Sequence, residues 1–212
     1  MIKRRLLLPL AGAMCLFASA CTSVGGGGGW NSPYVLARHG KTINVGNGAV
    51  SVIPPRDWNR TQRSILFSDV RWVEDWTLNG PYLDGISFVT ALPDNERLVR
   101  ESRRADRQVP KFRREMTAPE VASLIETWFR VRGGTVDFRT LSLAPRPFLG
   151  ANGFQFDFEH LDSDELWRKG RAVGAVIDGR LYLMLYDAAR SHYYDAALPD
   201  FEAMVASAHR RR

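Results

Sequence analysis

The chain has 212 residues, of which 45% are hydrophobic, and a formal net charge of +6. Removal of the basic residues Lys3, Arg4 and Arg5 would leave +3, a balance too weak to indicate a dedicated nucleic-acid-binding protein. The only cysteines, Cys15 and Cys21, lie near the N-terminus, so a domain that follows them has no disulfide and no thiolate for zinc or nucleophilic chemistry. We therefore expect stability from packing, with no metal and no cofactor.

The N-terminal 20 residues have the layout of a secretory signal peptide. Basic residues at positions 3–5 precede an apolar stretch over residues 6–17, and the small residues 18–20 form a cleavage site. The apolar stretch has about 12 residues, fewer than the roughly 20 that a helix needs to cross a bilayer. We therefore predict that residues 1–20 are removed on export and are not a permanent transmembrane anchor.

Cys21 follows these small residues directly. The pattern resembles the lipobox of bacterial lipoproteins, although Ala18 stands where that motif usually has leucine. The resemblance implies that Cys21 is acylated and that several acyl chains hold the protein stably to a membrane. Thr22 is not the aspartate that retains such proteins at the inner membrane, which implies the periplasmic face of the outer membrane. The alternatives are the inner membrane, or a secreted protein that is cut after Ala20 and leaves Cys21 unmodified.

A glycine run follows the cysteine. Residues 25–29 are all glycine, and such a run loses too much conformational entropy to hold regular structure. We assign residues 21–46 to the lipidated cysteine and a flexible linker, and residues 47–212 to one globular domain, a length that suits a single core.

The sequence beyond the linker predicts β-hairpins with helices between and after them. Strands are expected at residues 49–53, 72–78, 82–92, 136–139, 154–159, 167–177 and 181–186, and helices at residues 117–133 and 199–209. Thr117 and Glu120 fit a capping box, and Asp178-Gly179 fits a two-residue hairpin turn. The predicted fold class is α+β, an antiparallel β-sheet with helices packed on it.

Four segments resemble the PsbP-like α+β fold. They are VIPPRDW at 52–58, GFQFDF at 153–158, VIDGRLYL at 176–183 and MVASA at 204–208. The resemblance covers roughly residues 48–209 and includes no functional motif. It implies a non-enzymatic accessory or assembly role and transfers no site residue.

Two segments contain residue types that occur in hydrolases. The Arg-His-Gly tripeptide at 38–40 resembles the signature of histidine phosphatases, in which the residue equivalent to His39 is the phosphoryl nucleophile. The alternating β/α pattern of those enzymes is missing here. Ser191, His192 and Asp195 supply the residue types of a triad, but a triad assembles from distant segments. We interpret residues 191–198 as a loop that leads to the last helix, with Tyr193 and Tyr194 packing.

Acidic residues gather around the hairpin predicted near residue 160. They are Asp157, Glu159, Asp162, Asp164 and Glu165, and they lack the glycine and the final glutamate of an EF-hand loop. We therefore expect a solvated strand face and an acidic turn here, not a calcium site. His160 extends the face on which the phenylalanines of this strand lie.

The segment between residues 95 and 115 is the strongest candidate for a binding surface. It contains eight basic and four acidic side chains. Guanidinium and ammonium groups bind phosphate and carboxylate, so an anionic ligand is one interpretation and a solvated connection of mixed charge is the other. The candidate anion-binding residues are Arg100, Arg103, Arg104, Arg107, Lys111, Arg113 and Arg114.

Together these features predict a lipid-anchored periplasmic protein of the bacterial envelope that is not an enzyme. Its expected role is that of an interaction or assembly module, with an envelope protein or an anionic envelope polymer as partner. A binding module that uses residues 97–114 and a hydrolase that uses His39 are the alternatives.

Overall fold

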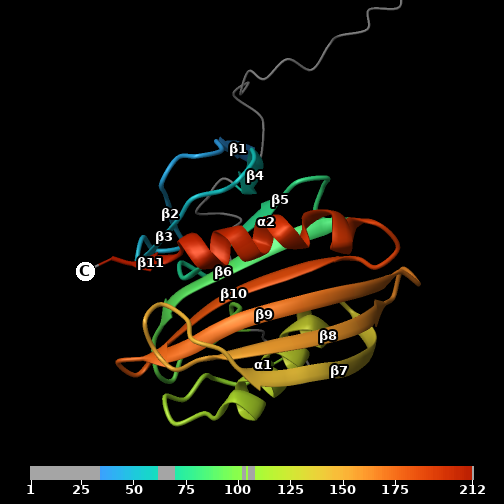
Figure 1. Cartoon of the computed structure of the whole chain (residues 1–212). Helices are drawn as coiled ribbons and strands as arrows, with labels where there is room; N and C mark the ends of the chain where they lie inside the picture. The colour runs from blue at the N-terminus through green and yellow to red at the C-terminus, as the bar shows by residue number, and fades with distance from the viewer. Residues whose placement is uncertain (1–33, 62–69, 102–103, 105–107, 212) are drawn as a thin grey trace, which may run out of the picture.

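The computed structural model describes residues 34–61, 70–101, 104 and 108–211. An eight-stranded antiparallel sheet forms its centre (Figure 1). In spatial order its strands are β1 (Tyr34–Ala37), β4 (Trp58–Thr61), β5 (Val73–Thr77), β6 (Asp84–Leu92), β10 (Arg180–Ala189), β9 (Trp167–Ile177), β8 (Phe154–Asp162) and β7 (Thr135–Pro145). A small second sheet has the order β11 (His209–Arg210), β3 (Val50–Val52), β2 (Ile43–Val45).

The two helices cover opposite faces of the large sheet (Figure 1). Helix α1 (Ala118–Arg132) packs beneath β7 and β8, where Phe129 contacts Phe158 with 5.2 Å between ring centroids. Helix α2 (Tyr193–Ser207) lies on the other face, where the rings of Phe201 and Tyr186 stack at 5.7 Å. Each helix therefore seals its own hydrophobic core, and the central strands are buried on both sides.

Local signals in the sequence account for several elements. The backbone N–H of Thr117 donates to the Glu120 carboxylate at 2.6 Å, so the predicted capping box begins α1. Asp178 and Gly179 both have positive φ, at 51° and 71°, as a type I′ turn between β9 and β10 requires. No helix among the described residues is long and apolar enough to cross a membrane.

The structure differs from the sequence interpretation near both ends of the domain. Residues 34–37 and 43–45, which we placed in the linker, form β1 and β2 and pair with β4 and β3. Strands of three or four residues carry too short a pattern to be recognised before their partners are known. Helix α2 begins at Tyr193 and not at Pro199, because the burial of Tyr194 and Ala197 extends the helix through a proline that we expected at its start.

Candidate functional site

His160 is the most unusual residue of the described chain, because its ionisable side chain is fully buried. It lies on β8 after Phe154, Phe156 and Phe158, and the alternation of the strand turns all four side chains toward the core under α1. The His160 ring packs against Phe129 of α1 at 4.6 Å between centroids. The predicted extension of the phenylalanine face is therefore confirmed.

Two carboxylates hold the His160 ring. Asp162 Oδ1 lies 2.7 Å from Nδ1, and Asp187 Oδ1, from β10, lies 2.8 Å from Nε2. Burial disfavours the charged ring, but the hydrogen bonds to Asp162 and Asp187 outweigh it and raise the pKa of His160 to about 9. His160 is thus an imidazolium at neutral pH, with one N–H donated to each carboxylate. Neither ring nitrogen is available as a base, a nucleophile or a metal ligand.

Arg168 of β9 completes this cluster. Its Nε donates to Asp162 Oδ2 at 2.9 Å, and one terminal nitrogen reaches Asp164 at 3.3 Å. Burial opposes the charge on Asp162, but hydrogen bonds from His160 and Thr135 hold its pKa below the usual range. We call His160, Asp162, Asp187 and Arg168 the His160 cluster. Its cations and anions compensate one another, as buried charges require.

A cavity of about 640 Å³ opens beside this cluster. Its floor includes Ser87 and Asp187 on neighbouring strands, together with Gly85, which is the cross-strand partner of Asp187. Its walls include Phe129 near the end of α1 and Tyr82, which is 79% exposed. A mainly apolar cavity with a few convergent polar groups is the usual form of a small-ligand site.

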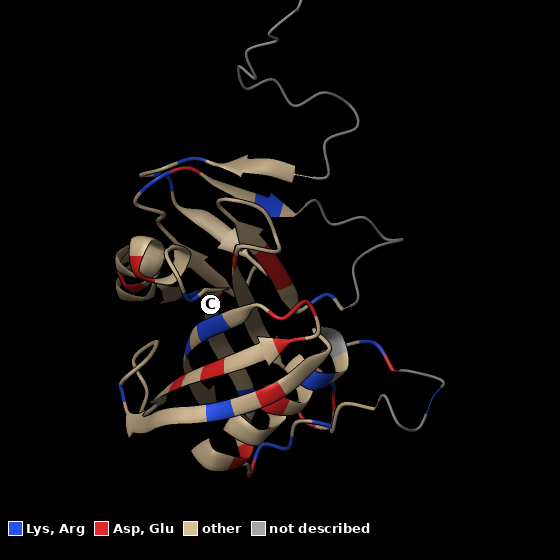
Figure 2. Cartoon of the chain, turned by 90° about the vertical axis from the view of Figure 1, so that its right-hand side faces the viewer, with Lys and Arg blue, Asp and Glu red and all other residues tan. Residues whose placement is uncertain are grey.

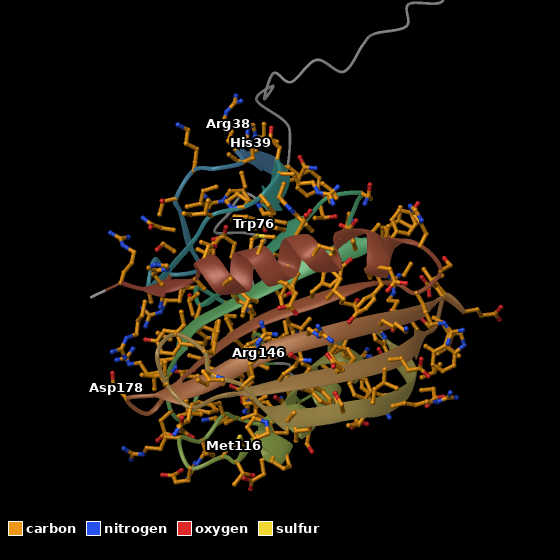
Figure 3. The ribbon with its side chains drawn as sticks, in the orientation of Figure 1. Arg38, His39, Trp76, Met116, Arg146 and Asp178 are labelled. Atoms are coloured by element: carbon orange, nitrogen blue, oxygen red, sulfur yellow. The ribbon has the colours of Figure 1, made fainter. Side chains whose placement is uncertain are left out.

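A second charge network joins the sheet to α2. Arg171 donates to Asp157 at 2.6 Å and to Glu202 at 2.9 Å, and Arg146 donates to Glu202 at 2.6 Å. Figure 3 shows Arg146 below α2, on the sheet face that α2 partly covers. Burial opposes the charge on Glu202, but the hydrogen bonds from both arginines hold its pKa below the usual range.

The acidic residues that we expected on a solvated face therefore pair with basic residues. Asp157 binds Arg171, and Glu159 lies 3.4 Å from Arg139 and 3.5 Å from Arg190. No group of three or more potential metal ligands occurs within the described ranges. Figure 2 shows basic residues interspersed with acidic ones over this part of the chain.

The other two sequence candidates lie elsewhere. His39 follows β1, its side chain is 73% exposed, and Nδ1 lies 2.8 Å from Asp57 Oδ1. The His39 backbone N–H and ring hold the pKa of Asp57 below its usual range. His192 precedes α2, and Asp195 lies in its first turn, so the loop that we expected there is largely helical.

The described parts of the basic segment of residues 97–114 pack against the core under α1. Backbone hydrogen bonds of 2.8 Å join Phe112 to Asn95 and Glu96, and Leu98, Val109 and Phe112 are buried. The basic side chains that the structure describes are exposed at this surface: Arg100, Arg104, Lys111, Arg113 and Arg114. Arg103 and Arg107 lie outside the described residues, as does Cys21. Figure 3 shows Met116, which follows this segment, at the opposite end of the molecule from His39.

The basic residues of this segment differ in their pairing. Arg113 reaches Asn95 at 3.4 Å, and Arg114 reaches Glu115 at 3.2 Å. Arg100 and Lys111 form no ion pair with the residues that the structure describes. The segment thus presents two cations that are not paired with any carboxylate in the described parts of the chain.

Sequence reasoning did not identify the His160 cluster as a site. A signal was present, because Asp162 follows His160 by two residues and Asp187 follows Leu185 by two, which places each carboxylate on a buried strand face. What the sequence did not reveal is the pairing that brings β8 and β10 to either side of β9.

Comparisons with known proteins identify the fold. No family model matches the sequence, and no curated protein matches it. The solution structure of cyanobacterial PsbP (CyanoP) from Synechocystis is similar, with a TM-score of 0.54 and 16% identity over 89% of this chain and 99% of that chain. A crystal structure from Bacteroides thetaiotaomicron matches with a TM-score of 0.47 and 10% identity, over 82% of this chain and 49% of that one, and no argument rests on it. The chain therefore has the PsbP-like α+β fold that its sequence predicts.

Proposed function

We propose that the protein is a lipid-anchored module of the bacterial envelope that acts by binding a partner and not by catalysis. The observation that carries this proposal is the state of His160. The ring that most resembles a catalytic group is held as an imidazolium between two carboxylates, at 2.7 and 2.8 Å. A general base or nucleophile needs a free ring nitrogen, and this ring has none.

The location follows from the N-terminal sequence. The signal-peptide layout and Cys21 support acylation at the periplasmic side, and the glycines at 25–29 support a flexible connection between lipid and domain. Metabolic labelling with an alkyne fatty acid tests this. We expect Cys21→Ser to abolish labelling and Cys15→Ser, inside the predicted signal peptide, to preserve it. Labelling that persists in Cys21→Ser would refute the anchor.

The binding role has its own test. A photo-crosslinking residue placed at the exposed position 82 or 136 should capture a discrete partner in intact cells, whereas a screen with phosphate and carboxylic esters should show no turnover. Turnover that disappears in His160→Phe or in His39→Ala would overturn the non-catalytic assignment. The two variants separate an enzyme built on the His160 cluster from one built on the Arg-His-Gly tripeptide.

A second candidate function is the binding of an anionic envelope component by residues 97–114. The observation that favours it is the exposure of Arg100 and Lys111 on a segment whose apolar side chains are fixed in the core. Replacing both by glutamate should weaken sedimentation of the protein with anionic vesicles or with isolated cell-wall polymer. Lys41→Glu, near the opposite end of the molecule, is the control for charge alone. Equal binding by both variants would exclude this surface.

A further inference from the structure

Asp187, which lines the cavity beside the His160 cluster, has a carboxylate oxygen that no described residue engages. Asp187 engages His160 through Oδ1, and its other oxygen makes no hydrogen bond with the described residues. Its cross-strand partner is Gly85, which has no side chain to cover the floor. By contrast, Asp84, which also lines the cavity, accepts hydrogen bonds from Thr77, Leu78 and Asn79. Asp187 therefore keeps one oxygen that could accept a hydrogen bond from a ligand.

The charges around the cavity favour a ligand of positive charge. Five aspartates line it, at positions 75, 84, 162, 164 and 187, and the only lining cation among the described residues is Arg168. Even with the buried His160 imidazolium counted beside Arg168, aspartates outnumber cations among the described residues around the cavity. An anion would enter against this field, whereas a cation would be attracted to it.

The residues that line the walls favour a ligand with an apolar or aromatic part. The exposed surface of the cavity is mainly apolar, and its lining residues include the aromatic side chains of Tyr82 and Phe129. Aromatic faces attract organic cations, and apolar walls favour a ligand with a hydrocarbon or aromatic body. The volume of about 640 Å³ lies within the range that small-molecule sites occupy.

We propose that this cavity binds a small amphipathic cation, an ammonium or guanidinium group on an apolar or aromatic body. The cation lies beside Asp187, and the body lies against Tyr82 and Phe129. The inference gives a ligand class to the binding module described above, and it rests on that proposal only in treating the protein as a binder and not an enzyme. It does not depend on Cys21 or on residues 97–114.

Three indole compounds of nearly equal size test the assignment. Tryptamine is cationic, tryptophol is neutral and indole-3-acetate is anionic at neutral pH. Their dissociation constants for the full chain are measured by calorimetric titration at low salt, and the site is located by the amide NMR signals of residues 85–87. We expect tryptamine to bind at least tenfold more tightly than tryptophol, and indole-3-acetate to bind most weakly.

Two variants test separately whether binding depends on the Asp187 charge and on the open space above Gly85. Asp187→Asn should weaken the binding of tryptamine about tenfold and leave the affinity for tryptophol nearly unchanged. Gly85→Val retains every charge but places a side chain on the floor, where a new Cβ would meet its nearest atom, the Trp76 carbonyl oxygen, at the ordinary contact distance of 3.6 Å. This variant should weaken the binding of both tryptamine and tryptophol. Asp195→Asn, an equal loss of charge on α2, should change neither.

Several results would overturn the inference. These are the absence of tryptamine binding, equal affinity for tryptamine and tryptophol, or unchanged affinity in Gly85→Val. The same results would leave the fatty-acid labelling and the cellular crosslinks intact, so failure of the ligand class is distinguishable from failure of the proposed function. Thermal unfolding of each variant shows whether the fold is retained, and Gly85→Val provides the test should Asp187→Asn unfold by loosening His160.

Discussion

Replacing His160 by phenylalanine separates the charge of the buried ring from its packing. The new ring keeps the contacts to Phe129 and Phe158, whose centroids lie 4.6 and 6.0 Å from that of His160. It removes the cation that bridges Asp162 and Asp187. Removing one partner of a buried ion pair costs about 3–5 kcal/mol, because a buried charge is left without compensation. We expect a loss of this order in the free energy of unfolding at pH 6.5.

The loss should depend on pH in a direction that the pKa of His160 fixes. Folding raises this pKa from 6.5 to about 9, which corresponds to about 3 kcal/mol at 1.36 kcal/mol per unit. A group whose pKa is raised on folding contributes its full stabilisation below the unfolded pKa. The contribution declines as the pH rises from 6.5 and is lost above 9. The advantage of the wild type over His160→Phe should therefore shrink by about 3 kcal/mol across this interval.

Urea unfolding at pH 6.5, 8 and 9.5 measures this advantage directly. His192→Phe is the matched control, because His192 is exposed and forms no ion pair with the described residues. It controls for the loss of a histidine that lies outside the His160 cluster. A difference between wild type and His160→Phe that does not change with pH would refute the assignment of His160 as a buried imidazolium.

Three further changes test the packing and the second charge network. Glu202→Gln should cost about 1 kcal/mol at pH 7 in urea unfolding and progressively less as the pH falls below 4.5, because a carboxylate whose pKa is lowered on folding loses its stabilising contribution as the pH falls through the folded pKa. Gly170→Ala should cost about 1–3 kcal/mol in the same assay, since a Cβ there would lie 2.1 Å from the Phe158 ring. Thr117→Ala should lower the stability by about 1 kcal/mol and fray the start of α1, measured by amide exchange.

Local patterns in the sequence were enough to predict the central hairpins and α1. The alternation on β8 and the Asp178-Gly179 turn each determine a structure over a few residues, and no distant partner is needed to read them. The same holds for the capping box at Thr117. The α+β class followed from these elements alone, because hairpins interrupted by helices favour an antiparallel sheet.

The short strands and the site depend on long-range pairing. Strand β1 is recognisable only through its pairing with β4, and Ile43–Val45 only through Val50–Val52. His160 and Asp187 are 27 residues apart in the sequence. They meet because β8 and β10 lie on either side of β9 in the sheet. A single sequence contains the alternation of each strand but not the order of strands, so it could predict that His160 is buried but not what holds it.

The distribution of charge limits how this protein can select a partner. Acidic residues of β8 lie beside basic residues of β7 and β9, and ion pairs join Asp157 to Arg171 and Glu159 to Arg139. Such a surface has no extended field of one sign, so long-range steering contributes little to association. Selectivity must then come from places where a charge is left uncompensated at short range. The second carboxylate oxygen of Asp187 and the cations at Arg100 and Lys111 are three such places, and variants at these positions test a cationic ligand against an anionic one.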